Sequence, residues 1–431
     1  EILPFQSRTK KSFKSIKESL DNELKKTHGT PKNQYASAGT LDRVLERIDP
    51  GCSFLARAEE SAKKFEGLPG NAKGCRTRSG GGMERDEHDL EDTLDRRFAC
   101  ADPHHPASIL VREAARDQMG TGHPAIPAQG GKQVRHMPGQ ADDQKSYQSL
   151  DPIDLLRSEA KLPALPQVFS ELQAVMGQDH SSASDLAAVI SKDASLSGFL
   201  LRIVNSAFYS FPSRIDTISR AVTVIGTGRL SALATGMSLM PLFSEGLPRG
   251  TSLELFWKHS IACGVAARDL AGALEEEEPE RYFVAGLLHD IGKLAMYRLK
   301  PERGEAVITL QAREERASYR IEQEVYGFDH ARFGGMLLRK WNLPYPLVMG
   351  VLNHHDPKSD SGNIEPLIVH VADFTVNGLG FGFVESCCAP PLAPWSWERL
   401  GLTEVDFSSV VRGLHGQCEM MFQVLLEEGR G

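Results

Sequence analysis

The stretch Ala285–Leu294 constrains this chain most, because His289 and Asp290 stand side by side inside an apolar segment. From Arg281 to Leu299, apolar residues fall on most sides of an α-helix, which is typical of a helix buried within a bundle. Burying an imidazole and a carboxylate is costly unless each has a partner. We therefore expect other His or Asp side chains, a metal ion, or both, to face this helix.

The composition is that of a soluble globular protein, with 41% apolar and 25% charged residues. The formal charge of −8 gives no electrostatic reason for nonspecific nucleic-acid binding. The longest largely apolar run, Leu230–Phe243, is shorter than the roughly 20 residues that span a bilayer. We therefore expect no nucleic-acid partner and no membrane span.

Cysteine usage indicates the cellular compartment. The seven cysteines are an odd number and lack the spacing of a disulfide framework. No basic segment followed by an apolar core opens the sequence, so no secretory signal is expected. Both features favour a reducing cytoplasm.

Residues 1–150 contain few sustained hydrophobic patterns and many chain breakers, as in Asn71–Gly82 and Gly122–Gln133. This composition predicts a mostly disordered tail, with short amphipathic helices possible, for example at Pro106–Gln118. The histidines of this region stand beside Gly, Pro and charged residues, so we expect solvated side chains. Order is predicted to begin near Asp151.

Beyond Asp151, apolar residues recur at helical spacing and no alternating strand pattern competes with them. The predicted fold class is therefore all-α. After a Gly/Pro-rich stretch at Gly378–Pro394, the pattern Val411 to Leu425 predicts a final amphipathic helix that packs as a cap or forms an oligomer surface. The helices expected between Ser252 and Asn377 are Ser252–Leu274, Arg281–Leu299, Gly304–Tyr326, Asp329–Trp341, Pro346–Asn353 and Glu365–Asn377.

Residues 218–239 have the outline of a helix-turn-helix, with Gly226–Gly228 in the turn. A helix that reads DNA needs exposed basic or amide side chains at its base-reading positions. Arg229 is nearly alone there. The pattern favours an internal helical hairpin over a DNA-binding element.

Partners for the His-Asp doublet lie on the inward faces of further helices. Any one inward histidine is more often a hydrogen-bonded core residue than a ligand. Together they form a mixed nitrogen and oxygen set that suits Fe, Mn or Zn rather than Ca or Mg. The candidate metal ligands are His259, His289, Asp290, His330, His354, His355 and Asp373.

Such a set has a chemical use. Two ions about 3.5–4 Å apart can polarise a phosphoryl oxygen and activate water for in-line attack. Asp290 and Lys293 are the candidate catalytic residues, because Lys293 lies one helical turn past His289, where it could reach a phosphate. The alternative for Lys293 is a surface lysine with its stem along apolar surface.

Five motifs follow one another along the chain, at Leu162–Pro166, Ile190–Tyr209, Ala285–Leu294, Gly327–Pro344 and Asn353–Pro357. Together they resemble the HDOD family, the HD-related output domains of bacterial signalling proteins, over Ile153–Leu379. The resemblance implies that the seven candidate ligands are the HD metal motif and that the protein is regulatory.

The same resemblance implies an organisation in two helical subdomains. The first covers residues 151–248 and the second, HD-like, covers residues 249–380. A C-terminal loop and capping helix at 381–431 follow, and the 1–150 tail precedes them.

Two functions remain open. The first is bacterial signal transduction through interaction with another signalling protein, with a retained metal site of one or two divalent ions and possible homo-oligomers. The alternative is a metal-dependent phosphohydrolase acting on a nucleotide or related phosphoester. Cyclic di-GMP is not the favoured substrate, because no Gly-Tyr-Pro follows His354-His355 as it does in the similar HD-GYP phosphodiesterases.

Overall fold

The computed structural model describes residues 93–427 apart from several gaps, and all of these residues belong to one compact unit of the chain. Within the described ranges every regular element is a helix, so the predicted all-α class is confirmed. No helix in this part of the chain is both long enough and apolar enough to cross a membrane. The gaps are residues 100, 103–104, 121–146, 159–161, 179–181, 244–247, 249–250, 315, 359–361 and 383–388.

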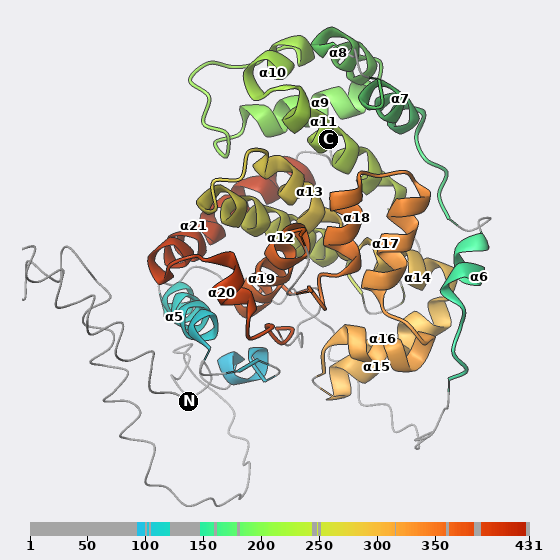
Figure 1. Ribbon diagram of the computed structural model, residues 1–431, viewed down its shortest axis with the longest axis vertical. Helices are drawn as coiled ribbons and strands as arrows, with labels where there is room; N and C mark the ends of the chain where they lie inside the picture. Colours follow the sequence, from blue (N-terminus) through green and yellow to red (C-terminus); the bar gives the residue numbers. More distant parts are fainter. Residues whose placement is uncertain are drawn as a thin grey trace, which may run out of the picture. The chain divides into compact units, whose positions relative to one another are not determined.

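Five helices follow the short α6 (Pro152–Arg157) and gather in one part of the fold (Figure 1). A capping box between Ser182 and Asp185 begins α8. The five helices are α7 (Gln167–Met176), α8 (Ala183–Ser191), α9 (Ala194–Asn205), α10 (Ile218–Ile225) and α11 (Thr227–Leu239).

The helical hairpin predicted at residues 218–239 is confirmed as α10 and α11, joined at Gly226 with a φ of +97°. Nearly every residue of α11 from Leu230 onward is buried, and the helix packs against α13. A helix buried on all sides cannot enter a DNA groove. The short 3-10 helix η2 (Met240–Phe243) continues α11.

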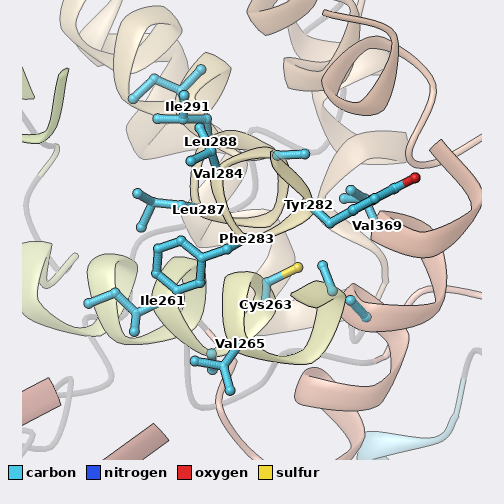
Figure 2. Close-up of a cluster of buried hydrophobic side chains, with 14 of the residues drawn as sticks. Ile261, Cys263, Val265, Tyr282, Phe283, Val284, Leu287, Leu288, Ile291 and Val369 are labelled. Carbon is cyan, nitrogen blue, oxygen red and sulfur yellow. The ribbon is translucent and has the colours of Figure 1, made fainter. Parts of the chain in front are cut away.

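The core of the remaining fold is the pair α12 (Leu253–Ala273) and α13 (Pro279–Leu288). Figure 2 shows Phe283 of α13 between its own helix and the α12 residues Ile261 and Cys263. A Cβ at Gly264 would lie 2.7 Å from the Phe283 carbonyl oxygen, so the two backbones are too close for a side chain there. The expected helix Ser252–Leu274 is thus present and central.

Two predicted helices are each interrupted. The sequence predicted one helix over Arg281–Leu299, but α13 ends at Leu288 and α14 (Ile291–Leu299) begins after His289 and Asp290. At Asp290 the backbone leaves the helical region, with φ −94° and ψ 3°. The chain turns at the doublet, and α14 then packs against α17.

The predicted helix Gly304–Tyr326 is also two helices, α15 (Pro301–Glu314) and α16 (Ser318–Tyr326). Ala317 precedes α16 with an extended ψ of 130°, which an uninterrupted helix does not allow. The two helices pack against each other instead of forming one rod.

The other predicted helices of this region occur within a residue or two of their expected bounds. Asp329 caps the N-terminus of α17 by accepting a hydrogen bond from the Arg332 backbone N–H. The chain ends in a short helix and then the predicted amphipathic helix, whose last turn widens into a π-type turn (η3, Gln423–Glu427). The helices near their expected bounds are α17 (His330–Lys340), α18 (Tyr345–Leu352) and α19 (Glu365–Gly378). The short helix is α20 (Ser396–Leu400), which was not predicted, and the amphipathic helix is α21 (Glu404–Phe422), which begins before the predicted pattern at Val411.

Ordered structure begins earlier than the predicted start near Asp151. The possible helix at Pro106–Gln118 forms as α5 (Pro106–Gly120) and packs against α19 and α21. Phe98, in the helical segment before it, lies edge-on to Phe374 of α19 with ring centroids 6.0 Å apart. The rest of the predicted tail, residues 1–92 and 121–146, lies outside the described residues.

Substituting Gly292 tests the close approach of α14 to α17. A Cβ there would lie 2.0 Å from the His330 carbonyl oxygen and 2.8 Å from the Gly334 nitrogen. We expect Gly292→Ala to lower the free energy of unfolding by about 3 kcal/mol in metal-free protein, because backbone rather than a flexible side chain must move. Urea denaturation measures the change.

Gly272→Ala is the matched control, since nothing lies within 4 Å of a Cβ at that position. Its free energy of unfolding should not fall and should rise by up to about 1 kcal/mol, because alanine favours an exposed helical position more than glycine does. Equal effects of the two substitutions would contradict the proposed contact between α14 and α17.

Candidate metal centre

All seven predicted ligands lie together. Their side-chain nitrogen and oxygen atoms form three overlapping groups, and within each group the atoms lie within 4.8 Å of one another. The residues come from five places in the fold: His259 on α12, His289 and Asp290 between α13 and α14, His330 at the start of α17, His354 and His355 after α18, and Asp373 on α19.

One half of the cluster brings together His259, His289 and Asp373. The Nε2 atom of His259 lies 3.3 Å from the Nε2 atom of His289 and 3.3 Å from Oδ1 of Asp373. Oδ1 of Asp373 also lies 3.7 Å from Nε2 of His289. We name these three residues the first half.

The second half consists of His330, His354 and His355. The Nε2 atom of His330 lies 2.9 Å from Nε2 of His355 and 3.3 Å from Nε2 of His354. Asp290 contacts both halves, because its Oδ1 lies 2.8 Å from Nε2 of His330 and its Oδ2 lies 3.6 Å from Nε2 of His259. The carboxylate therefore has a bridging position.

Hydrogen bonds on the far side of each ring fix the orientation of the histidines. The Nδ1 atoms of His259, His289 and His354 lie 2.7–2.9 Å from the backbone carbonyl oxygens of Phe381, Gly286 and Val351 in that order. A carbonyl oxygen only accepts, so each Nδ1 carries the proton. In the neutral ring the Nε2 lone pair is then free for a ligand.

His330 is oriented in the same way by a carboxylate. Its Nδ1 donates to Oε2 of Glu322 at 2.6 Å, and its backbone N–H donates to the same oxygen at 2.8 Å. Four imidazoles thus point their Nε2 atoms at a common region, with their protons on the opposite nitrogen.

One carboxylate oxygen of Asp290 lies buried among the candidate ligands. Although Nε2 of His330 is 2.8 Å away, Oδ1 of Asp290 has no contact with hydrogen-bond geometry and is buried. Lone pairs on a carboxylate oxygen and on several imidazole nitrogens repel one another unless a proton or a metal ion lies between them. The donor set and this orphaned oxygen fit a divalent transition metal.

Burial and the neighbouring charges shift the pKa values of the clustered side chains. Burial opposes protonation of His330, but Glu322 and Asp290 outweigh it and raise its pKa to about 9. Burial also disfavours the ionised form of Asp290, yet the charge on His289 and its cationic neighbours holds the pKa of that carboxyl well below its usual range. Burial and the charge on His289 lower the pKa of His354. The carboxylates therefore stay ionised and attract cations.

Lys293 lies inside the protein. It is 7% exposed, and its Nζ donates a hydrogen bond to Oδ2 of Asp290 at 2.7 Å. The alternative of a surface lysine is therefore wrong. Its role toward a phosphate stays a prediction.

Sequence reasoning missed the groups that support the ligands. Glu322 holds His330, Asn377 donates to Oδ1 of Asp373 at 2.7 Å, and the Tyr319 ring stacks on His355. The one available signal was Glu322, a glutamate beside the apolar residue Ile321 on a buried helix face. A buried acid on such a face requires a partner.

A separate pocket of about 290 Å³ lies between α12, the start of α13 and α21. Arg268 and Asp269 line it, together with Gln417. It contains none of the seven candidate ligands, so it is distinct from the cluster.

His370 shares α19 with Asp373, but both its ring nitrogens already have partners. Nδ1 donates to the His354 carbonyl oxygen at 2.6 Å, and Nε2 accepts from the Ala393 backbone N–H at 3.0 Å. We expect His370→Ala to lower the free energy of unfolding by about 2 kcal/mol, because two buried backbone groups lose their partners. The number of bound metal ions should not change.

Urea denaturation and elemental analysis of the same preparation measure both quantities. Loss of metal from a His370→Ala protein of unchanged stability would show that His370 is a ligand after all.

Comparison with known proteins agrees with this fold. Residues 162–357 match the model of the HDOD domain. A protein of Treponema pallidum (strain Nichols), described as uncharacterised, is 28% identical over 217 residues, covering 49% of this chain and 41% of that protein. The match thus spans only about two fifths of the relative's length.

Solved structures resemble the chain at low sequence identity. An HDOD domain protein from Geobacter sulfurreducens is 20% identical with a TM-score of 0.52, covering 64% of this chain and 98% of that one. A candidate phosphohydrolase from Shewanella amazonensis is 23% identical with a TM-score of 0.51, covering 63% and 97%. A candidate signal transduction protein from Marinobacter aquaeolei is 22% identical with a TM-score of 0.50, covering 77% and 69%.

At these identities the likeness concerns the fold, and the family match concerns the segment that contains every candidate ligand except Asp373. Residues 162–357 of this chain are an HDOD domain.

Proposed function

We propose that this protein is a cytoplasmic bacterial signal-transduction protein whose HDOD domain holds divalent metal and acts through interaction with another signalling protein. The observation that supports this proposal is the enclosure of the candidate metal centre. The exposed fraction is at most 4% for every candidate ligand except His355, which is partly buried. An enclosed centre suits a metal that stabilises one conformation of a domain.

The number of ions follows from the two halves. Each half offers three side chains, and Asp290 lies within 3.6 Å of a histidine nitrogen in both. We expect up to two ions of Fe, Mn or Zn, with Asp290 as the shared ligand. A homo-oligomer is compatible with this role.

The alternative function is a metal-dependent phosphohydrolase acting on a nucleotide or related phosphoester. The complete ligand set favours it, because bound divalent ions supply Lewis acidity toward a phosphoryl oxygen and toward water. One structure of similar fold is described as a candidate phosphohydrolase. Reaction would require access to the centre past His355, its most exposed candidate ligand.

In this alternative the chain's own residues have distinct tasks. The histidine Nε2 atoms and Asp373 would bind the ions, and Asp290 would fix their separation. Lys293 holds Oδ2 of Asp290 at 2.7 Å and would supply positive charge to a bound phosphate. A phosphate that displaced this contact would exchange one anionic partner of Lys293 for another.

Metal content tests the shared basis of both functions. Full-length protein purified without chelator should contain Fe, Mn or Zn, measured by elemental analysis. Asp290→Ala should lose at least one ion per chain, because the bridging carboxylate is removed. Asp216→Ala, which removes an exposed carboxylate in a loop, should retain the full content. Metal-free protein even after reconstitution would contradict both functions.

A phosphodiesterase panel with Mn and with Fe separates the two functions. For the metal-loaded protein we expect no turnover of nucleotide or cyclic dinucleotide phosphoesters, because the centre is enclosed. Turnover that disappears in Asp290→Ala would replace the proposed function by the phosphohydrolase. Turnover that is unchanged in Asp290→Ala would belong to a contaminant.

A further inference from the structure

We infer that α16 is the positioning element of the second half, in which Glu322 and Tyr319 control how tightly one of two metal ions is held. The inference rests on the proposed metal binding and goes beyond it, because it assigns separate control to one ion. Neither residue is a candidate ligand, and each contacts a different histidine of the second half.

The two halves are supported by different parts of the fold. In the first half, His259 is held by the carbonyl of Phe381 and Asp373 is held by Asn377. In the second half, α16 supplies the contacts to His330 and His355. A change in α16 can therefore alter one half without directly touching the support of the other.

Glu322 acts on His330. The Glu322 side chain has no exposed surface, and its Oε2 accepts both from Nδ1 and from the backbone N–H of His330. The carbonyl oxygens that orient His259, His289 and His354 are neutral, whereas this partner is a carboxylate. A charged acceptor at Nδ1 makes Nε2 a stronger donor to metal and fixes the ring more firmly.

Tyr319 acts on His355. The two rings are stacked with centroids 4.3 Å apart and an interplanar angle of 23°. The Nδ1 atom of His355 is buried and has no hydrogen-bond partner, unlike Nδ1 in the other four candidate histidine ligands. No hydrogen bond at Nδ1 orients this ring, so the stack with Tyr319 restrains it.

Tyr319 and Glu322 are three residues apart, so they lie on the same face of α16. The far end of the helix is fixed as well. The Leu150 backbone N–H donates to the Tyr326 carbonyl oxygen at 2.8 Å, and Arg303 donates to the Val325 carbonyl oxygen. Because α16 is anchored, its two side chains can hold the histidines in a fixed geometry.

The test is titration of the full-length apoprotein with Mn²⁺ by calorimetry, followed by the rate at which a chelator removes each ion. Unsubstituted protein should bind two ions per chain. Glu322→Gln keeps the shape of the side chain. It should weaken the affinity for one ion about 10- to 100-fold and leave the affinity for the other ion unchanged. Tyr319→Ala should speed chelator removal of that same ion.

Two variants serve as controls. Tyr319→Phe retains the stacked ring and should bind and release both ions as the unsubstituted protein does. If the hydroxyl group rather than the ring stack mattered, Tyr319→Phe would differ from the unsubstituted protein. Asn377→Ala removes the hydrogen bond that supports Asp373 and should instead weaken the affinity for the other ion. Circular dichroism checks that each variant is folded, and Glu322→Gln alone decides the question if Tyr319→Ala does not fold.

The outcomes separate this inference from the proposed function. Unsubstituted protein that binds no metal would overturn the proposed function. Unsubstituted protein that binds a single ion, or a Glu322→Gln variant that affects both ions equally or neither, would overturn the role of α16 and leave metal binding in place.

Discussion

The buried carboxylate of Asp290 is the charge on which the rest of this centre depends. It is 1% exposed and lies within 3.6 Å of nitrogens from His259, His289, His330 and Lys293. A carboxylate so far from water is stable only with positive charge around it. The bend between α13 and α14 places it there, and the missing side chain at Gly292 lets α17 bring His330 within reach.

The clustering of the seven candidate ligands was predictable from sequence because the signals that mark these residues are local. A histidine or aspartate on an apolar helical face is an energetic exception that the residues themselves reveal, and Asp373 within α19 is an example. The helix break at His289-Asp290 was not predictable. Apolar spacing continues across the doublet, and the close approach of Gly292 to α17 after the turn involves a distant part of the chain that spacing does not reveal.

Supporting contacts were hidden for the same reason. Glu322 and His330 are eight residues apart and belong to different helices, so no spacing rule joins them. The stack of Tyr319 on His355 spans still more of the chain. The helix α5 was predicted only as a possible short helix within a disordered tail because breakers flank it, and its stability comes from tertiary packing on α19 and α21.

We propose above all that these side chains bind metal through their Nε2 and carboxylate oxygen atoms. Anomalous diffraction from crystals of the full-length protein, recorded at the Fe, Mn and Zn absorption edges, tests it most directly. We expect one or two anomalous peaks beside Asp290, within bonding distance of Nε2 of the surrounding histidines. A cluster without any peak in metal-reconstituted crystals, or with the metal bound elsewhere on the chain, would contradict it.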